Sequence, residues 1–153
     1  MQGTADMTGS AITIDDARLK RLYDYWLSKK HDRKAPRRAD ILPEEITDLL
    51  PWVFLMERVG HRLRYRLVGD EFRQIYGAKL IGMYMDEVDL DHVTAAYIGE
   101  YATAEKDGPV VRKWKFTKHD GRYVEYERLI LPLSSDGTTI DMFLCGAVGF
   151  GYG

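Results

Sequence analysis

Hydrophobic positions recur with a helical period near the start of the chain. Five apolar side chains between residues 15 and 30 stand three and four residues apart, the spacing of one helix face: Leu19, Leu22, Tyr23, Trp26 and Leu27. Asp15 or Asp16 is suited to cap the start of this helix. A second, short helix is predicted to begin at Pro43 and to end before Pro51, because proline suits a first helical turn and stops a preceding one.

The period changes to two in the following segment, which predicts strands. Residues 52–59 and 62–69 form a predicted hairpin that turns at Gly60-His61, and in its second strand three apolar residues alternate with three arginines. Three further strands are expected over residues 110–118, 122–133 and 140–150. The last of these is apolar with little alternation, which is typical of a strand covered on both faces, so we expect it at the centre of the sheet.

Helices are predicted between the hairpin and the later strands. A short helix is expected near residues 72–77, and a longer one over residues 90–106 ends at Asp107-Gly108-Pro109. Five antiparallel strands with helices grouped between the second and third make one α+β domain. We expect residues 1–14 to be a flexible N-terminus, residues 15–51 to hold the first helix and the short helix, and residues 52–150 to form the core.

Composition narrows the function classes. Lys and Arg total 22 and Asp and Glu total 24, a net charge of −2, which argues against a generally basic nucleic-acid-binding protein. The single cysteine, Cys145, excludes an intramolecular disulfide and a zinc site with several thiolates. We see no signal peptide and no stretch long enough to span a membrane, so a cytoplasmic protein is expected. Ten tyrosines suggest an interior that handles polar groups.

The chain resembles a PAS domain, and most closely a group of bacterial proteins in which a short leader precedes a single PAS domain. The resemblance spans roughly residues 19–149, and its most specific part is the block from Tyr65 to Gly82. It is carried by Tyr25-Trp26, Arg33, Pro36, Arg38, Asp40, Ile46 to Pro51, Trp52-Val53-Phe54-Leu55, Tyr65-Arg66-Leu67-Val68-Gly69, Tyr76-Gly77, Leu80, Gly82, Glu127 to Leu133 and Asp136-Gly137. Asp70 departs from the pattern, because a small hydroxyl residue is expected there.

The resemblance implies an antiparallel sheet of strand order 2-1-5-4-3, with helices on one face and an N-terminal leader helix. It also implies a sensory or adaptor protein of bacterial signal transduction, not an enzyme, that binds a small ligand or a protein partner. We expect output through a protein partner or through a homodimer formed by the leader helix. The apolar stripe of that helix has two possible destinations, another subunit or the outer face of its own sheet.

An interior ligand pocket is the first candidate site. Its expected lining residues lie on elements that would face one another: Tyr65, Tyr76, Met83, Tyr97, Tyr101, Trp114, Tyr126 and Phe143. The alternative is a filled core with no ligand, because aromatic stripes at such spacings usually serve packing. Glu100 lies beside the apolar arc of the long helix, and we expect it at the helix edge in water rather than buried against a ligand.

The cofactor of such a pocket is unknown, but flavin and haem are not expected. The flavin photosensors of this family use a cysteine in a short helix, whereas Cys145 falls in the last predicted strand. Haem needs an axial histidine, and His92 at the start of the long helix is the one candidate. The other histidines, His31, His61 and His119, lie in predicted loops without metal-ligand spacing, so no metal site is expected.

A basic segment, residues 29–38, is a second candidate site, with six Lys or Arg in ten residues. Arg33 and Arg38 are candidates for binding an anion, because guanidinium binds two oxygens at once. The alternative is structural: Arg38 pairs with Asp40, or the two arginines hold the leader against the domain. We expect no nucleic-acid binding by this patch.

A different function class is an enzyme with a cone-shaped α+β fold, of the ketosteroid-isomerase or dehydratase kind. It would use a pocket carboxylate with a tyrosine for acid–base chemistry, and Glu100 with Tyr97 or Tyr101 is the one loose candidate. A third alternative is a structural interaction domain with a filled core.

Overall fold

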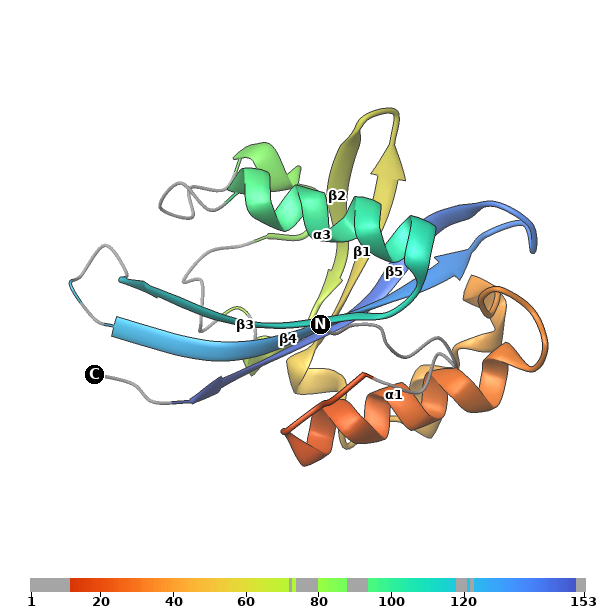
Figure 1. Ribbon diagram of the computed structural model, residues 1–153, viewed down its shortest axis with the longest axis horizontal. Coiled ribbons are helices and arrows are strands. Elements are labelled where there is room, and N and C mark those ends of the chain that lie inside the picture. The colour runs from red at the N-terminus through yellow and green to blue at the C-terminus, as the bar shows by residue number, and fades with distance from the viewer. Residues whose placement is uncertain are drawn as a thin grey trace.

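A five-stranded antiparallel sheet forms the centre of the computed structural model, in the order β2-β1-β5-β4-β3 (Figure 1). The structure describes residues 12–71, 73, 80–87, 94–117, 121 and 123–150. The strands are β1 (Val53–Val59), β2 (Arg62–Val68), β3 (Val110–Thr117), β4 (Tyr123–Ser134) and β5 (Ile140–Phe150). The prediction that the last strand is central is confirmed, and its apolar run is explained by cover on both faces.

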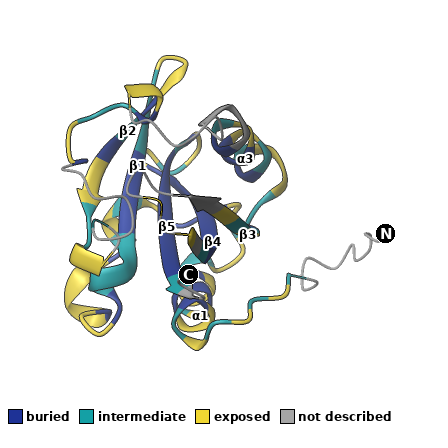
Figure 2. Ribbon diagram, turned by 90° about the vertical axis from the view of Figure 1, so that its left-hand side faces the viewer, coloured by how far each residue is buried: buried dark blue, intermediate teal, exposed yellow. Residues whose placement is uncertain are grey.

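The two faces of the sheet are covered by different helices. Helix α3 (Thr94–Asp107) lies over one face and α1 (Ala17–Lys30) lies under the other (Figure 1). Alternation along β5 divides its side chains between them: Phe143 packs against α3, whereas a Cβ on Gly146 would come within 2.6 Å of Leu19 Cδ2 in α1. The buried residues gather on the central strands between these layers (Figure 2).

The leader helix α1 docks on its own sheet, one of the two destinations left open by its sequence. Asp16 caps the helix and accepts hydrogen bonds from the backbone N–H groups of Arg18 and Leu19. Four residues of the stripe are buried, whereas Leu27 is exposed, and the indole N–H of Trp26 donates to the carbonyl of Pro132 in β4 at 2.8 Å. The Glu127 carboxylate accepts the backbone N–H groups of residues 15 and 16, each at 2.9 Å, and so fixes the start of the helix.

The prediction of one short helix that begins at Pro43 and ends before Pro51 is wrong about the type of helix. The segment forms separate 3₁₀ turns: η1 (Arg38–Asp40), η2 (Pro43–Glu45) and η3 (Leu50–Trp52). Ile46 leaves helical geometry at φ −133°, and the bonds that close η2 join residues three apart, which is the 3₁₀ pattern. Both η2 and η3 have a proline in their first two positions, and Pro51 ends any helix that begins at Pro43, because a proline inside a helix lacks the N–H donor and clashes with the preceding turn.

The region between the hairpin and α3 is described in part. Residues 70, 71 and 73 are helical, and the rest of the predicted short helix lies outside the described residues. Another 3₁₀ turn, η4 (Met85–Glu87), follows a stretch that bonds to β2 through Tyr65. Helix α3 is described from Thr94 and ends before Gly108, whose φ of +99° is left-handed and favours glycine. No helix in the described part of the chain is long and apolar enough to cross a membrane.

Candidate functional site

Residues from three elements meet on the face of the sheet that α3 covers. Tyr97, Glu100, Tyr101 and Ala104 follow helical spacing, and all four are buried. Their burial shows that this stripe is the face that α3 turns toward the sheet. Alternation along β4 places Tyr126 and Arg128 on the same side of the sheet. Trp114 of β3 lies on this side too, because its indole bonds to Glu100 of α3.

A buried ion pair lies at the centre of this face. Arg128 Nη2 is 2.5 Å from Glu100 Oε1, and the two side chains are 2% and 8% exposed. The other carboxylate oxygen, Glu100 Oε2, accepts the indole N–H of Trp114 at 2.8 Å. The Arg128 guanidinium lies 3.8 Å from the ring centroid of Tyr97, a cation–π contact. The expectation that Glu100 lies in water at the helix edge is therefore wrong, because the arginine beside it compensates the burial of its charge.

The tyrosine hydroxyls of this face bond to groups of the protein itself. The hydroxyls of Tyr97 and Tyr126 share a hydrogen bond, and the thiol of Cys145 donates weakly to the Tyr101 hydroxyl at 3.8 Å. Burial raises the pKa of Tyr101 well above its ordinary value and raises the pKa of Cys145 to about 12. Both groups are therefore neutral near pH 7.

The structure brings together most of the residues predicted to line an interior pocket. Tyr97 packs edge-on against Trp114 at 4.7 Å between ring centroids, and Tyr101 packs edge-on against Phe143 at 5.1 Å. Tyr65 lies further along the face, 6.1 Å from the Phe54 ring. Of the other residues predicted to line the pocket, Met83 is half-buried against the core and Tyr126 bonds to Tyr97. Tyr76 lies outside the described residues. Ligand binding by this set stays a prediction.

Sequence reasoning missed Arg128, although a signal was present. In β4 the core-facing register holds Tyr126, Arg128 and Ile130, so an arginine interrupts an otherwise buried series. A cation at such a position needs a buried acid across the interface, and Glu100 is the carboxylate on the buried face of α3. Pairing these two observations would have predicted the ion pair.

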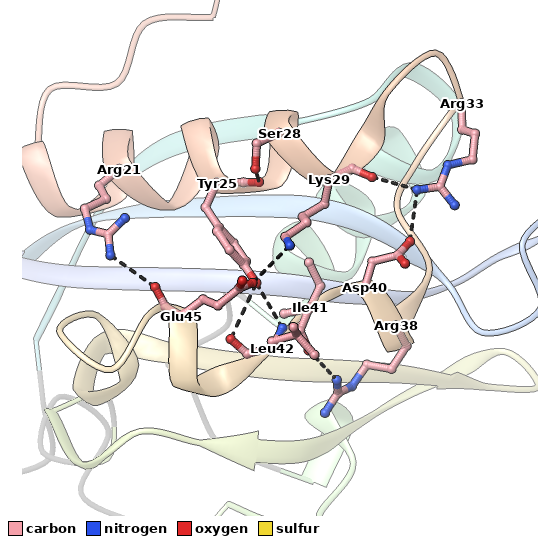
Figure 3. A network of polar contacts seen from close by, with 10 residues as sticks. All are labelled: Arg21, Tyr25, Ser28, Lys29, Arg33, Arg38, Asp40, Ile41, Leu42 and Glu45. Atoms are coloured by element: carbon pink, nitrogen blue, oxygen red, sulfur yellow. Dashed lines mark hydrogen bonds and ion pairs between the residues drawn. The ribbon is translucent and has the colours of Figure 1, made fainter.

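The two candidate anion-binding arginines have separate roles. Arg33 donates to the carbonyl of Lys29 at 2.6 Å and to Asp40 at 2.9 Å, so it joins the end of α1 to η1 (Figure 3). This is the structural alternative for Arg33. Arg38 does not pair with Asp40, and its Nη1 donates to the carbonyl of Ile41 at 3.2 Å (Figure 3).

The network around Arg33 continues along the leader. Tyr25 donates its hydroxyl to the Glu45 carboxylate at 2.7 Å, and Lys29 lies 3.0 Å from the same carboxylate (Figure 3). Leu42 donates its backbone N–H back to the Tyr25 hydroxyl at 2.9 Å. These bonds tie η2 to the outward side of α1, so two residues of the predicted basic segment, Lys29 and Arg33, hold the leader in place.

The sequence predicted neither flavin, haem nor a metal ion, from the positions of Cys145 and of the histidines. Cys145 is buried within β5 and bonded to Tyr101, a position unlike a cysteine on a short helix. His92 and His119 lie outside the described residues. In the described part of the chain, no group of three or more His, Cys, Asp or Glu is arranged to hold a metal ion. The predictions of no flavin, haem or metal stay predictions.

Comparison with known proteins points to one family. A sequence model described as a PAS domain matches residues 14–148. Among curated proteins, nothing matches the chain. The LOV protein of Rhodobacter sphaeroides is similar in structure, with a TM-score of 0.52 and 13% identity, over 65% of this chain and 59% of that one. This chain thus spans about three fifths of that relative.

Two further solved structures show the same likeness. The PAS domain of a protein from Colwellia psychrerythraea has a TM-score of 0.52 and 11% identity, over 70% of this chain and 95% of that domain. An RNA-binding light-oxygen-voltage receptor has a TM-score of 0.50 and 13% identity, over 72% of this chain and 33% of that one. At these identities the likeness establishes the fold alone.

Proposed function

Because this chain belongs to the PAS domain family, we propose that it is a non-enzymatic sensory or adaptor module of bacterial signal transduction whose state is set at the Glu100–Arg128 pair. PAS domains are a class of sensory signalling domain. The proposal rests on one observation: α3 is held to the sheet through a buried ion pair rather than through apolar contacts alone.

A buried ion pair is a suitable element for a switch. Its charges are stable only while they compensate one another, so a group that competes for either partner changes how α3 sits on the sheet. Trp114 and Tyr97 contact the same pair, and Trp114 carries the effect to β3. A small polar or charged ligand that replaces Glu100 at Arg128, or a protein partner that pulls on α3, would act at this point.

An enzymatic role is less well supported. The strand order 2-1-5-4-3 and the position of α3 between β2 and β3 differ from the cone-shaped enzyme fold considered above, so that alternative is set aside. The carboxylate it would use, Glu100, already accepts hydrogen bonds from Arg128 and Trp114, so a substrate would have to displace one of them. Tyr101 and Cys145 are neutral and enclosed.

Output through protein contacts follows from the same proposal. The predicted homodimer through the leader helix would have to use the outward side of α1, where Leu27 is exposed, because the buried stripe is already packed on the sheet. One structural relative is an RNA-binding receptor. For this chain we propose a protein partner instead, given its net charge of −2.

Hydrogen exchange tests the switch. Glu100→Gln is expected to speed backbone exchange over residues 94–107 more than over residues 17–30, because α3 loses its own anchor whereas α1 is affected only through the global loss of stability. The matched control is Glu105→Gln, which removes a half-exposed ion pair of the same helix, 2.8 Å from Arg58. Equal exchange of α3 in Glu100→Gln and the wild type would refute the proposal.

Native mass spectrometry separates the two kinds of input. A co-purifying small molecule that is lost from Arg128→Met would support ligand sensing at this face. If the wild type and Arg128→Met both show the mass of the protein alone, without a bound small molecule, a protein partner that acts on α3 is favoured.

A further inference from the structure

A cavity lies on the face of the sheet opposite the Glu100–Arg128 pair, under the 3₁₀ turns. Its volume is about 250 Å³. Residues of β1, β2 and β5 line one side, among them Leu55, Leu67 and Leu144, and the turns supply Ile41 and Ile46 on the other. The cavity is separated from the Glu100–Arg128 pair by the sheet itself, because Leu144 points away from the face that Phe143 and Cys145 line.

The cavity is kept open by a close approach between two backbone segments. A Cβ on Gly69 would lie 2.1 Å from the carbonyl oxygen of Leu50 and 2.4 Å from that of Pro51. Gly69 N–H also donates to the Val53 carbonyl at 2.8 Å. Glycine therefore allows η3 to pass directly over the end of β2, and this fixes the wall that Leu50 contributes.

One charged residue, Arg38, stands in the lining of this apolar cavity. Its guanidinium makes one hydrogen bond, to the Ile41 carbonyl, and it forms no ion pair with a carboxylate in the described part of the chain. Other arginines nearby do: Arg33 pairs with Asp40 and Arg21 pairs with Asp48. A half-buried arginine with donors to spare, beside apolar walls, complements a carboxylate that carries an apolar chain.

The rim of the cavity exposes apolar side chains that the fold does not cover. Ile81 is 57% exposed and Leu67 is 49% exposed, and both belong to the lining. Two large apolar residues exposed side by side around a hollow are characteristic of a binding site rather than of scattered surface residues. A ligand that enters the cavity would cover both.

We propose that this cavity binds a small aliphatic monocarboxylate, with the carboxylate on Arg38 and the chain against Leu55, Leu67 and Leu144. A water-sized group occupies about 30 Å³, so the cavity takes a chain of roughly eight such groups. We favour a free acid over a protein segment as the occupant for two reasons. The cavity volume is slightly below that of usual small-molecule pockets, and its lining carries a single charge, which one carboxylate would neutralise.

Octanoate is the probe for this proposal, and octan-1-ol, which lacks the charge, is its partner probe. In titrations followed by amide NMR shifts, octanoate is expected to shift the signals of residues 38, 67 and 81 and to bind more tightly than octan-1-ol. Arg38→Gln is expected to weaken octanoate about tenfold and to leave octan-1-ol unchanged, because only the charge-assisted bonds are lost. Ile81→Asp is expected to weaken both.

A matched control uses an arginine of β2, a strand that lines the cavity. Arg66→Gln removes a cation that is outside the cavity lining and is expected to leave octanoate binding unchanged. The proposal is overturned if octanoate binds no better than octan-1-ol, if its shifts map to the α3 face, or if Ile81→Asp changes only a monomer–dimer equilibrium. The last result would assign the patch to a second copy of the chain. The exchange of α3 in Glu100→Gln is measured without octanoate, so the two proposals fail separately.

Discussion

Arg128 in β4 and Glu100 in α3 form an ion pair in which both side chains are almost fully enclosed, at 2.5 Å between Nη2 and Oε1. The pair connects a helix to the sheet in the middle of an aromatic core. Its desolvation is offset by a third polar group, the Trp114 indole, and by the Tyr97 ring. The first prediction concerns the energetic coupling of the two charges.

Removal of one charge is expected to destabilise the fold far more than removal of both. Arg128→Met or Glu100→Gln alone should lower the free energy of unfolding by about 3–5 kcal/mol, because each leaves an uncompensated or unsatisfied partner in the core. The double variant should recover a large part of that loss. Urea unfolding of the four proteins measures the coupling. Simple additivity of the two single losses would contradict the ion pair.

The contact between α1 and β5 predicts opposite effects at two glycines. Gly146→Ala is expected to cost about 1–3 kcal/mol, because the new methyl would meet Leu19 Cδ2 at 2.6 Å and Leu22 Cδ2 at 3.1 Å. Gly99→Ala, the control, lies on an exposed position of α3 with nothing within 4 Å, and it should stabilise by about 0.5–1 kcal/mol. Thermal unfolding of both variants tests the docking of the leader. A neutral Gly146→Ala would show that α1 lies elsewhere.

The loop between β4 and β5 predicts an acid-sensitive contribution to stability. Backbone N–H groups of Thr139 and Thr138 and the hydroxyl of Ser134 donate to Asp136, and they hold the pKa of that carboxyl well below its ordinary value. A lowered folded-state pKa stabilises the fold above the ordinary aspartate pKa of about 3.9, and this contribution is lost as the pH falls below that value.

The variant Asp136→Asn tests that contribution. Its urea midpoint should fall less than that of the wild type between pH 5 and pH 3, because one acid-sensitive group is absent. Asp32→Asn, at an exposed position of the segment after α1, serves as the control. Parallel pH profiles of the wild type and Asp136→Asn would contradict the prediction.

The enclosed thiol of Cys145 predicts slow labelling. Because burial raises its pKa to about 12 and the side chain is inaccessible, the native protein should react with a thiol reagent at pH 8 only on unfolding. The same reagent should label it quickly in urea. Quick labelling of the native protein would mean that the α3 face opens readily.

Prediction from sequence succeeded where a residue's surroundings follow from its own neighbours along the chain. The unalternating run in β5 predicted a central strand, and the spacing of the stripe in α1 predicted which face is buried. Prediction failed between Pro43 and Pro51, where composition suited one helix but the chain forms separate 3₁₀ turns, each with a proline in its first two positions.

The sequence by itself determined the apolar face of α1 and the central place of β5, because a helix face or a strand face is set by residues a few places apart. Only the tertiary structure decided which charges meet. Glu100 and Arg128 stand 28 residues apart, and Arg33 rather than Arg38 reaches Asp40. Such pairings depend on the register between strands and on where each helix crosses the sheet, and no local pattern records either. The destination of α1 and the position of the Arg38 guanidinium beside an apolar cavity were decided in the same way.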